Sequence, residues 1–116
     1  MKIKKIQSLL AEFRFRLVNS EKDAVHRGVT LSKLNNLQQS KKIQDYEFSV
    51  FSQWGEDGII QKLISSVPIV NKTFIEFGVE NFLESNCRFL MTKDNWSGYV
   101  IDGSDKNVET IKNSSY

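Results

Sequence analysis

Two carboxylates stand at the ends of the two most strand-like segments of this chain of 116 residues. Glu76 lies in the run 73–77, and Asp102 follows the run 99–101 directly. In a parallel sheet, ligands bind outside the carboxyl ends of the strands. A carboxylate there can accept hydrogen bonds from both hydroxyl groups of a ribose, and Gly78 lets the backbone turn and approach a ligand closely. The pattern predicts a nucleoside site.

Each of these residues also has a purely structural explanation. Gly78 alone is typical of a turn, and Glu76 alone of a carboxylate that hydrogen-bonds a neighbouring loop. Asp102 alone is typical of a cap on a helix that begins near Asp105. Their joint placement at two adjacent strand ends favours the ligand site.

The elements that would position these residues alternate between helix and strand. Glu56 and Asp57 favour a helix start because their charge opposes the helix dipole, and Pro68 marks the end of that helix. Helices between strands indicate a parallel sheet with crossover connections, so the predicted fold class is α/β. The predicted elements are helices over 56–67, 83–91 and 106–113 and strands over 73–77 and 99–101.

Residues 1–45 predict a separate N-terminal helical segment. Apolar residues recur at three- and four-residue steps over positions 3–17, which is typical of an amphipathic helix, and Gly28 is expected to interrupt it. Residues 31–37 are either a second helix or part of a linker.

Charge divides the chain near the same point. Residues 1–45 hold ten basic and four acidic residues, a net charge of +6, whereas residues 46–116 hold six and ten, a net charge of −4. A basic segment can meet an anionic membrane, nucleic acid or an acidic protein. We favour the simpler interpretation of a solvated helix face that complements the acidic half of the same molecule.

Composition excludes several classes of site. Cys87 is the single cysteine and His26 the single histidine, so neither an intrachain disulfide nor a cysteine- or histidine-rich metal site is expected. We expect Cys87 in a helix core and His26 at the surface. No nucleic-acid-binding motif, secretory signal or apolar run of about 20 residues occurs, so a cytoplasmic protein without a transmembrane segment is expected.

The loop after Glu76 indicates which nucleoside fits. A dinucleotide-binding turn has three glycines in a GxGxxG pattern, whereas residues 78–83 contain one glycine and place Glu80 near the expected pyrophosphate. S-adenosylmethionine has no phosphate and carries a positive sulfonium and a positive ammonium group. The loop therefore favours S-adenosylmethionine over NAD.

Four sequence blocks resemble the FkbM-type methyltransferases in order and spacing. They are residues 52–58, 74–79, 84–86 and 96–104, so the resemblance covers about residues 46–116. It implies a partial Rossmann-like domain of the seven-stranded class I fold. It also implies S-adenosylmethionine as cofactor and methylation of oxygen on a sugar, other glycan or natural-product acceptor.

The resemblance also implies roles for individual residues. Asp102 takes the ribose-binding place, and Gln53 and Trp54 cover the site or simply pack and cap. The residues expected around the cofactor are Glu76 and Gly78 in its loop, Gly55, Glu56 and Asp57 at a helix start that holds the methionine carboxylate, and Glu84 and Asn86 at the start of the next helix.

The chain departs from the family pattern in two ways. Glu80 and Asn81 stand where a second glycine is common, but asparagine tolerates positive φ, so the turn remains possible. The sequence ends at Tyr116, before later strands, so we expect an N-terminal portion without turnover and name no catalytic residue. The alternative is a non-catalytic remnant or interaction module, held by a partner or self-associating through open sheet edges.

Overall fold

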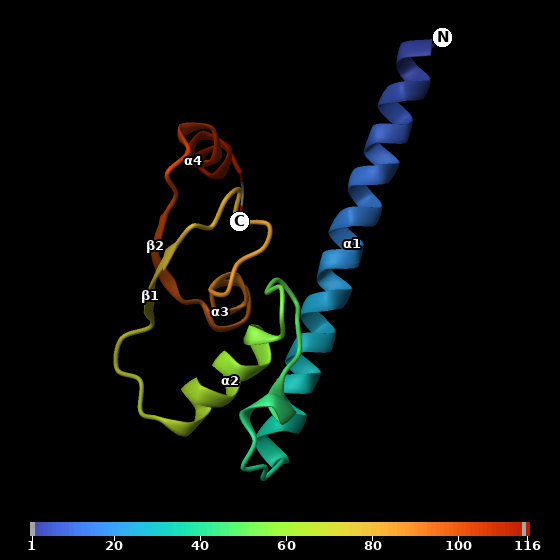
Figure 1. The fold of residues 1–116 in the computed structure, drawn as a ribbon. Helices are drawn as coiled ribbons and strands as arrows, with labels where there is room; N and C mark the ends of the chain where they lie inside the picture. The colour runs from blue at the N-terminus through green and yellow to red at the C-terminus, as the bar shows by residue number, and fades with distance from the viewer. Residues whose placement is uncertain (1, 115) are drawn as a thin grey trace.

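The computed structural model describes residues 2–114 and 116. Figure 1 shows a long helix at one side of a small body built from a sheet and short helices. The elements in chain order are α1 (Lys2–Leu37), the 3₁₀ helix η1 (Ile43–Tyr46), α2 (Glu56–Ser66), β1 (Thr73–Phe77), α3 (Arg88–Asp94), β2 (Ser97–Ile101) and α4 (Asp105–Lys112).

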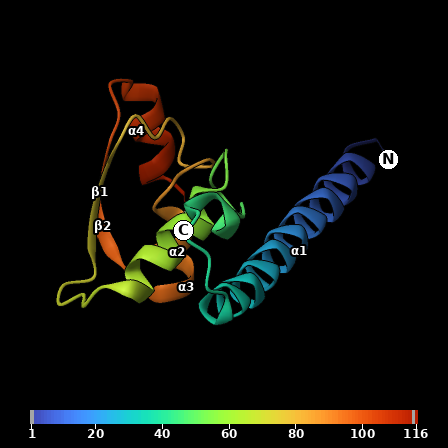
Figure 2. The same cartoon turned by 60° about the horizontal axis from the view of Figure 1, so that its bottom comes forward.

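The two strands form a parallel sheet in which Thr73 lies opposite Ser97 and Phe77 opposite Ile101. The chain passes from β1 to β2 through α3, as a parallel pair requires. The predicted order of helices and strands and the α/β fold class are therefore confirmed. Figures 1 and 2 both place α2 and α3 on the same side of the sheet.

The two faces of the sheet differ in burial. Side chains alternate between faces along a strand, and in β1 Phe74 and Glu76 are half-buried. The opposite face is apolar but exposed. It carries Ile75, Phe77, Tyr99 and Ile101. Self-association through this sheet stays a prediction.

The helix α1 corrects the expectation of a break at Gly28. It runs without interruption from Lys2 to Leu37. A Cβ at Gly28 would overlap Val50 Cγ2 and lie 2.8 Å from Phe89 Cζ, so the glycine permits close packing of α1 against the body. Over residues 2–114 and 116, no helix combines the length and hydropathy that a membrane crossing requires.

The second half of α1 is joined to the body by polar contacts as well as by this packing. Asn35 Nδ2 donates a hydrogen bond to the carbonyl of Tyr46 over 2.8 Å. Arg88 forms an ion pair with Glu21 over 2.8 Å. Both contacts join residues 1–45 to residues 46–116. The division of the chain into these two parts stays a prediction.

Phe89 is the most buried large apolar side chain and lies at the centre of the body. Its ring contacts the ring of Phe48 edge to face, with 5.8 Å between centroids. The other buried apolar side chains come from the segment that precedes α2, from the loop after β1 and from α3. They are Tyr46, Phe51, Val79, Phe82 and Leu90.

The loop between β1 and α3 is longer than predicted. The spacing of apolar residues predicts a helix from residue 83, but α3 begins at Arg88. Glu80 and Phe82 have φ angles of 50° and 66°, which no α-helix contains. Glu84 and Asn86 therefore lie in a loop and not at the start of a helix, contrary to the prediction.

Candidate functional site

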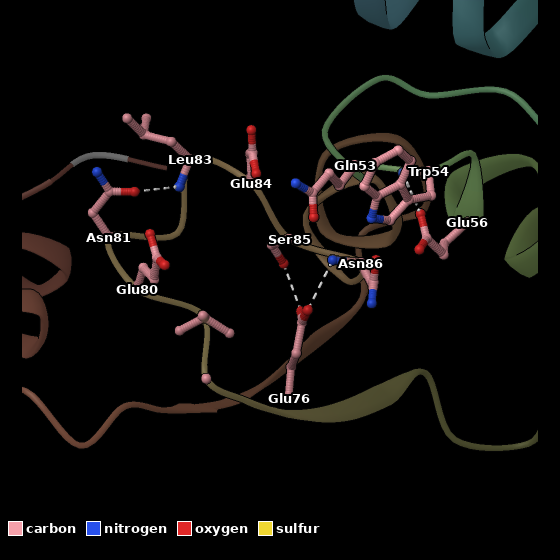
Figure 3. Close-up of a pocket in the computed structure, with 12 residues that line it drawn as sticks. Gln53, Trp54, Glu56, Glu76, Glu80, Asn81, Leu83, Glu84, Ser85 and Asn86 are labelled. Carbon is pink, nitrogen blue, oxygen red and sulfur yellow. Dashed lines mark hydrogen bonds between the residues drawn. The ribbon is translucent and has the colours of Figure 1, made fainter.

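A cavity of about 460 Å³ opens at the carboxyl end of β1. Figure 3 shows that its walls come from three segments: the turn before α2, the end of β1 and the loop that follows β1. Its lining includes Glu56, Glu76, Gly78, Glu84 and Asn86, all of which the sequence predicted as site residues. The predicted location, outside the end of the first strand, therefore holds a concave site.

The charge of this cavity is one-sided. Four of its lining residues are glutamates, namely Glu56, Glu76, Glu80 and Glu84, and none of its described lining residues is basic. Carboxylates gathered in this way raise the local concentration of cations and repel anions such as diphosphates. The cavity is thus suited to a cationic ligand.

Glu76 organises the wall of the cavity. Its Oε2 accepts hydrogen bonds from Ser85 Oγ at 2.5 Å and from the backbone N–H of Cys87 at 3.0 Å. Its Oε1 accepts one from the backbone N–H of Asn86 at 2.8 Å (Figure 3). The carboxylate therefore fastens residues 85–87 to the end of β1, just before α3 begins.

The turn after Glu76 depends on Gly78, as the sequence predicted. Gly78 has a φ of 67°, and its N–H donates to the carbonyl of Ile101 over 2.8 Å. The non-glycine residues with positive φ in the loop are Glu80 and Phe82, and not Asn81. Asn81 therefore does not use the positive φ that asparagine tolerates, and its Oδ1 instead accepts the N–H of Leu83 in a side-chain turn.

Asp102 lies at the end of β2 and outside the lining of the cavity. Its Oδ2 accepts the backbone N–H of Glu80 at 2.8 Å, and its Oδ1 accepts Asn107 Nδ2 and the backbone N–H of Ser104, each at 2.9 Å. The hydrogen bonds from Asn107, Ser104 and Glu80 hold the pKa of Asp102 below its usual value. Asp102 thus ties the loop after β1 to the start of α4.

Asp57 points into the protein and not into the cavity. It is 1% exposed, and its Oδ2 accepts the backbone N–H groups of Val50, Phe51 and Ser52 at 2.7, 2.8 and 2.9 Å. Ser52 Oγ in turn accepts the N–H of Asp57 at 3.0 Å. The carboxylate therefore fixes the turn that leads into α2.

Backbone N–H groups in the first turn of α2 already donate hydrogen bonds within the chain. Gly55 precedes the helix with a φ of 99°, where a side chain would be strained. The N–H of Gly58 donates to the carbonyl of Phe48 over 3.0 Å. Glu56 reaches the cavity, and its Oε2 accepts the N–H of Trp54 at 2.8 Å. The role of this helix start in holding a ligand carboxylate stays a prediction.

Gln53 and Trp54 lie at the mouth of the cavity, as Figure 3 shows. The Trp54 side chain is 74% exposed, so its ring is free to cover a bound molecule. Aromatic faces attract cations within about 6 Å of the ring centroid. The placement agrees with a covering role for these two residues.

Ser85 and Arg88 are important residues to which the sequence assigned no role. Ser85 is buried against Glu76. Arg88 is buried with its guanidinium over the rings of Phe51 and Tyr116, at 4.3 and 4.8 Å from their centroids. Ser85 belongs to the block 84–86 and Arg88 to none of the four blocks, and no motif indicates that Ser85 binds Glu76 or that Arg88 lies over two aromatic rings.

Cys87 is half-buried and directly precedes α3, contrary to the expectation of a position in a helix core. Burial, followed by the negative charge of Glu76, raises the pKa of its thiol to about 12 from an ordinary value of 9.0. The thiolate population at pH 8 is then about a thousandfold lower than in an unfolded chain.

We expect iodoacetamide to alkylate Cys87 at pH 8 about a thousandfold more slowly in the native protein than in guanidinium chloride. The native rate should continue to rise with pH beyond 9, because the thiol gives up its proton only near its raised pKa. Mass spectrometry of quenched time points measures both rates. Equal rates in the folded and unfolded chains would contradict the environment described for this thiol.

A second hollow of about 260 Å³ opens at the other end of the sheet. Its lining includes Lys72 and Trp96, which precede the two strands, and Gln61, which donates to Asp94 over 2.7 Å. Acidic and basic side chains are mixed in its lining, so its charge favours neither cationic nor anionic ligands. The acidic cavity remains the better candidate site.

No family model, curated protein or solved structure matches the chain. The resemblance to FkbM-type methyltransferases is therefore carried by its four sequence blocks alone.

Proposed function

We propose that residues 46–116 form the cofactor-binding part of an S-adenosylmethionine-dependent methyltransferase of the FkbM type. The proposed acceptor is an oxygen of a sugar, other glycan or natural product, following the sequence resemblance. The observation that carries the proposal is the acidic cavity at the carboxyl end of β1. Such crevices are where open parallel sheets bind nucleosides.

The charge of the cofactor supports its assignment. S-adenosylmethionine carries a sulfonium and an ammonium group, and four glutamates line the cavity without a basic residue in its described lining. A diphosphate would meet repulsion from the same carboxylates, which disfavours NAD. The volume of about 460 Å³ also falls in the range of roughly 300–1,000 Å³ that is usual for small-molecule sites.

The carboxylates differ in their freedom to meet a ligand. Glu76 is held by residues 85–87, whereas Glu84 is exposed and lies on the rim of the cavity. We therefore place the cationic methionine end beside Glu84 and beneath Trp54. Contact between the ribose and Asp102 would require the loop to release the hydrogen bond that Glu80 N–H donates to that carboxylate.

The chemistry proposed for these residues is binding and orientation. The bound cofactor would supply an electrophilic methyl group, and transfer depends strongly on alignment with the acceptor oxygen. The glutamates would fix the cationic end of the cofactor, and Trp54 would exclude water from it. We assign no catalytic base among the described residues.

Calorimetry with the chain tests the proposal directly. We expect S-adenosylmethionine to bind. Its product S-adenosylhomocysteine keeps the ammonium and carboxylate groups but lacks the sulfonium charge, and should bind about fivefold or more weakly because the glutamates attract the sulfonium. Glu84→Gln should reduce the ratio of the two dissociation constants. The matched control is Glu109→Gln, which removes an exposed charge on α4, outside the lining of the cavity, and should leave the ratio unchanged.

Two outcomes would contradict the cofactor assignment. The first is that titration with S-adenosylmethionine gives no heat of binding although circular dichroism shows that the chain is folded. The second is binding that Asp102→Ala and Glu84→Gln both leave unaltered. Absence of binding together with self-association would favour the second candidate, an interaction module, for which the exposed apolar face of the sheet is the specific observation.

A further inference from the structure

The first half of α1 carries an apolar surface that projects beyond the body of the protein. Figures 1 and 2 both show this half of the helix extending away from the sheet and the other helices. The hydrogen bonds that join α1 to the rest of the described chain begin at Glu21, with Arg88, and continue at Ser32 and Asn35. Seven large apolar side chains in the first half are each more than half exposed, and six of them recur at three- and four-residue steps: Ile3, Ile6, Leu9, Leu10, Phe13 and Leu17.

These six residues, which we call the α1 stripe, share one side of the helix. At 3.6 residues per turn they fall within an arc of about 120°. Phe15 lies on the opposite side and is also exposed. A continuous exposed apolar surface of this kind marks a site of interaction with another molecule or with a membrane.

Charge decides between the possible occupants of the stripe. Residues 2–17 contain five basic residues and one acidic residue, Glu12, a net charge of +4. The same segment of a second copy carries the same net positive charge, so electrostatic repulsion disfavours pairing of the two helices. An anionic bilayer surface matches it, at about 1 kcal/mol, or fivefold in affinity, for each basic residue near the surface.

The positions of the basic residues fit a bilayer surface better than a protein groove. Lys5 and Arg16 border one edge of the stripe and Arg14 borders the other, as their helical angles show. Long basic side chains at such borders can reach lipid phosphates while the apolar face lies among the acyl chains. A narrow groove would enclose these flanks and remove them from water.

We propose that residues 2–17 of α1 bind in the plane of an anionic lipid bilayer, with the α1 stripe buried at the acyl boundary. The rest of the chain would then be held beside the membrane by the continuous helix that ends at Leu37. The inference is independent of the cofactor assignment, because it rests on a part of the chain that does not line the cavity.

Co-sedimentation of the full chain with lipid vesicles tests this proposal. The probes are vesicles of phosphatidylcholine alone and of phosphatidylcholine and phosphatidylglycerol in equal parts. Phe13→Asp places a charge in the stripe, and Phe15→Asp makes the same change on the opposite side at similar exposure, 61% and 67% for the native side chains. We expect tight binding to the anionic vesicles only, with a loss of about tenfold or more in Phe13→Asp and less than about threefold in Phe15→Asp.

Removing charge provides a second, independent variant. Arg14→Gln with Arg16→Gln should weaken binding to the anionic vesicles about 20-fold or more. Circular dichroism confirms that each variant keeps its helix. Equal losses in the two phenylalanine variants, or equal binding to both kinds of vesicle, would overturn the proposal. The proposal would also be overturned if the wild-type chain formed a dimer, did not bind vesicles, and lost its dimer in Phe13→Asp. That result would identify a second copy as the occupant of the α1 stripe.

Discussion

Replacing Asp57 with asparagine is expected to lower the free energy of unfolding by about 4 kcal/mol. The carboxylate is buried and one of its oxygens accepts three backbone N–H groups, from residues 50–52. An asparagine can offer its carbonyl oxygen to these N–H groups only without the charge, and its amide N–H groups would be buried where Asp57 Oδ1 has no hydrogen-bond partner among the described residues. Urea denaturation followed by circular dichroism measures the loss.

Glu56→Gln is the matched control for this change. The two acids are neighbours in the first turn of α2 and lose the same charge, but Glu56 is only half-buried and accepts one backbone N–H, from Trp54. We expect a loss of less than about 1 kcal/mol. Similar losses in the two variants would show that the buried contacts of Asp57 do not hold the turn before α2.

The elements of this chain could be predicted wherever the local pattern carries the signal. The apolar face of α2, its acidic first turn and Pro68 located that helix, which the structure ends at Ser66. The strand run 73–77 coincides with β1. Parallel pairing followed from the helical segment between the strands, since a parallel pair needs a long crossover.

The direction in which a side chain points could not be predicted in the same way. Glu56 and Asp57 have the same charge and adjacent positions, yet one lines the cavity and the other is buried under residues 50–52. The choice is made by tertiary contacts and not by helix periodicity. The sequence pattern therefore predicted both residues as cofactor-binding, although only Glu56 lines the cavity.

Gly28 and the loop after β1 show the same limit. Glycine normally weakens a helix, but at Gly28 the missing side chain makes room for Phe89, 61 positions later in the chain. In the loop, Glu80 adopts positive φ although its type disfavours this, and its N–H is held by Asp102. Both outcomes depend on partners that no local window contains.

Two of the four cavity glutamates, Glu76 and Glu84, are expected to differ in role: Glu76 supports the wall of the cavity, whereas Glu84 attracts the ligand. Glu76→Gln is expected to lower the free energy of unfolding by about 3 kcal/mol, because two backbone N–H groups and the Ser85 hydroxyl lose a charged acceptor. The change should also speed alkylation of Cys87 about tenfold, since the charge of Glu76 helps to raise the pKa of that thiol.

Glu84→Gln removes the same charge from an exposed position on the cavity rim and should change the unfolding free energy by less than about 0.5 kcal/mol. If Glu76 positions the loop, then Glu76→Gln should weaken S-adenosylmethionine and S-adenosylhomocysteine together, whereas Glu84→Gln should weaken mainly the cationic cofactor. Denaturation, alkylation and calorimetry on the two variants measure these effects separately. Loss of cofactor binding in Glu76→Gln at unchanged stability would contradict the positioning role, because a direct contact with the cofactor needs no support from residues 85–87.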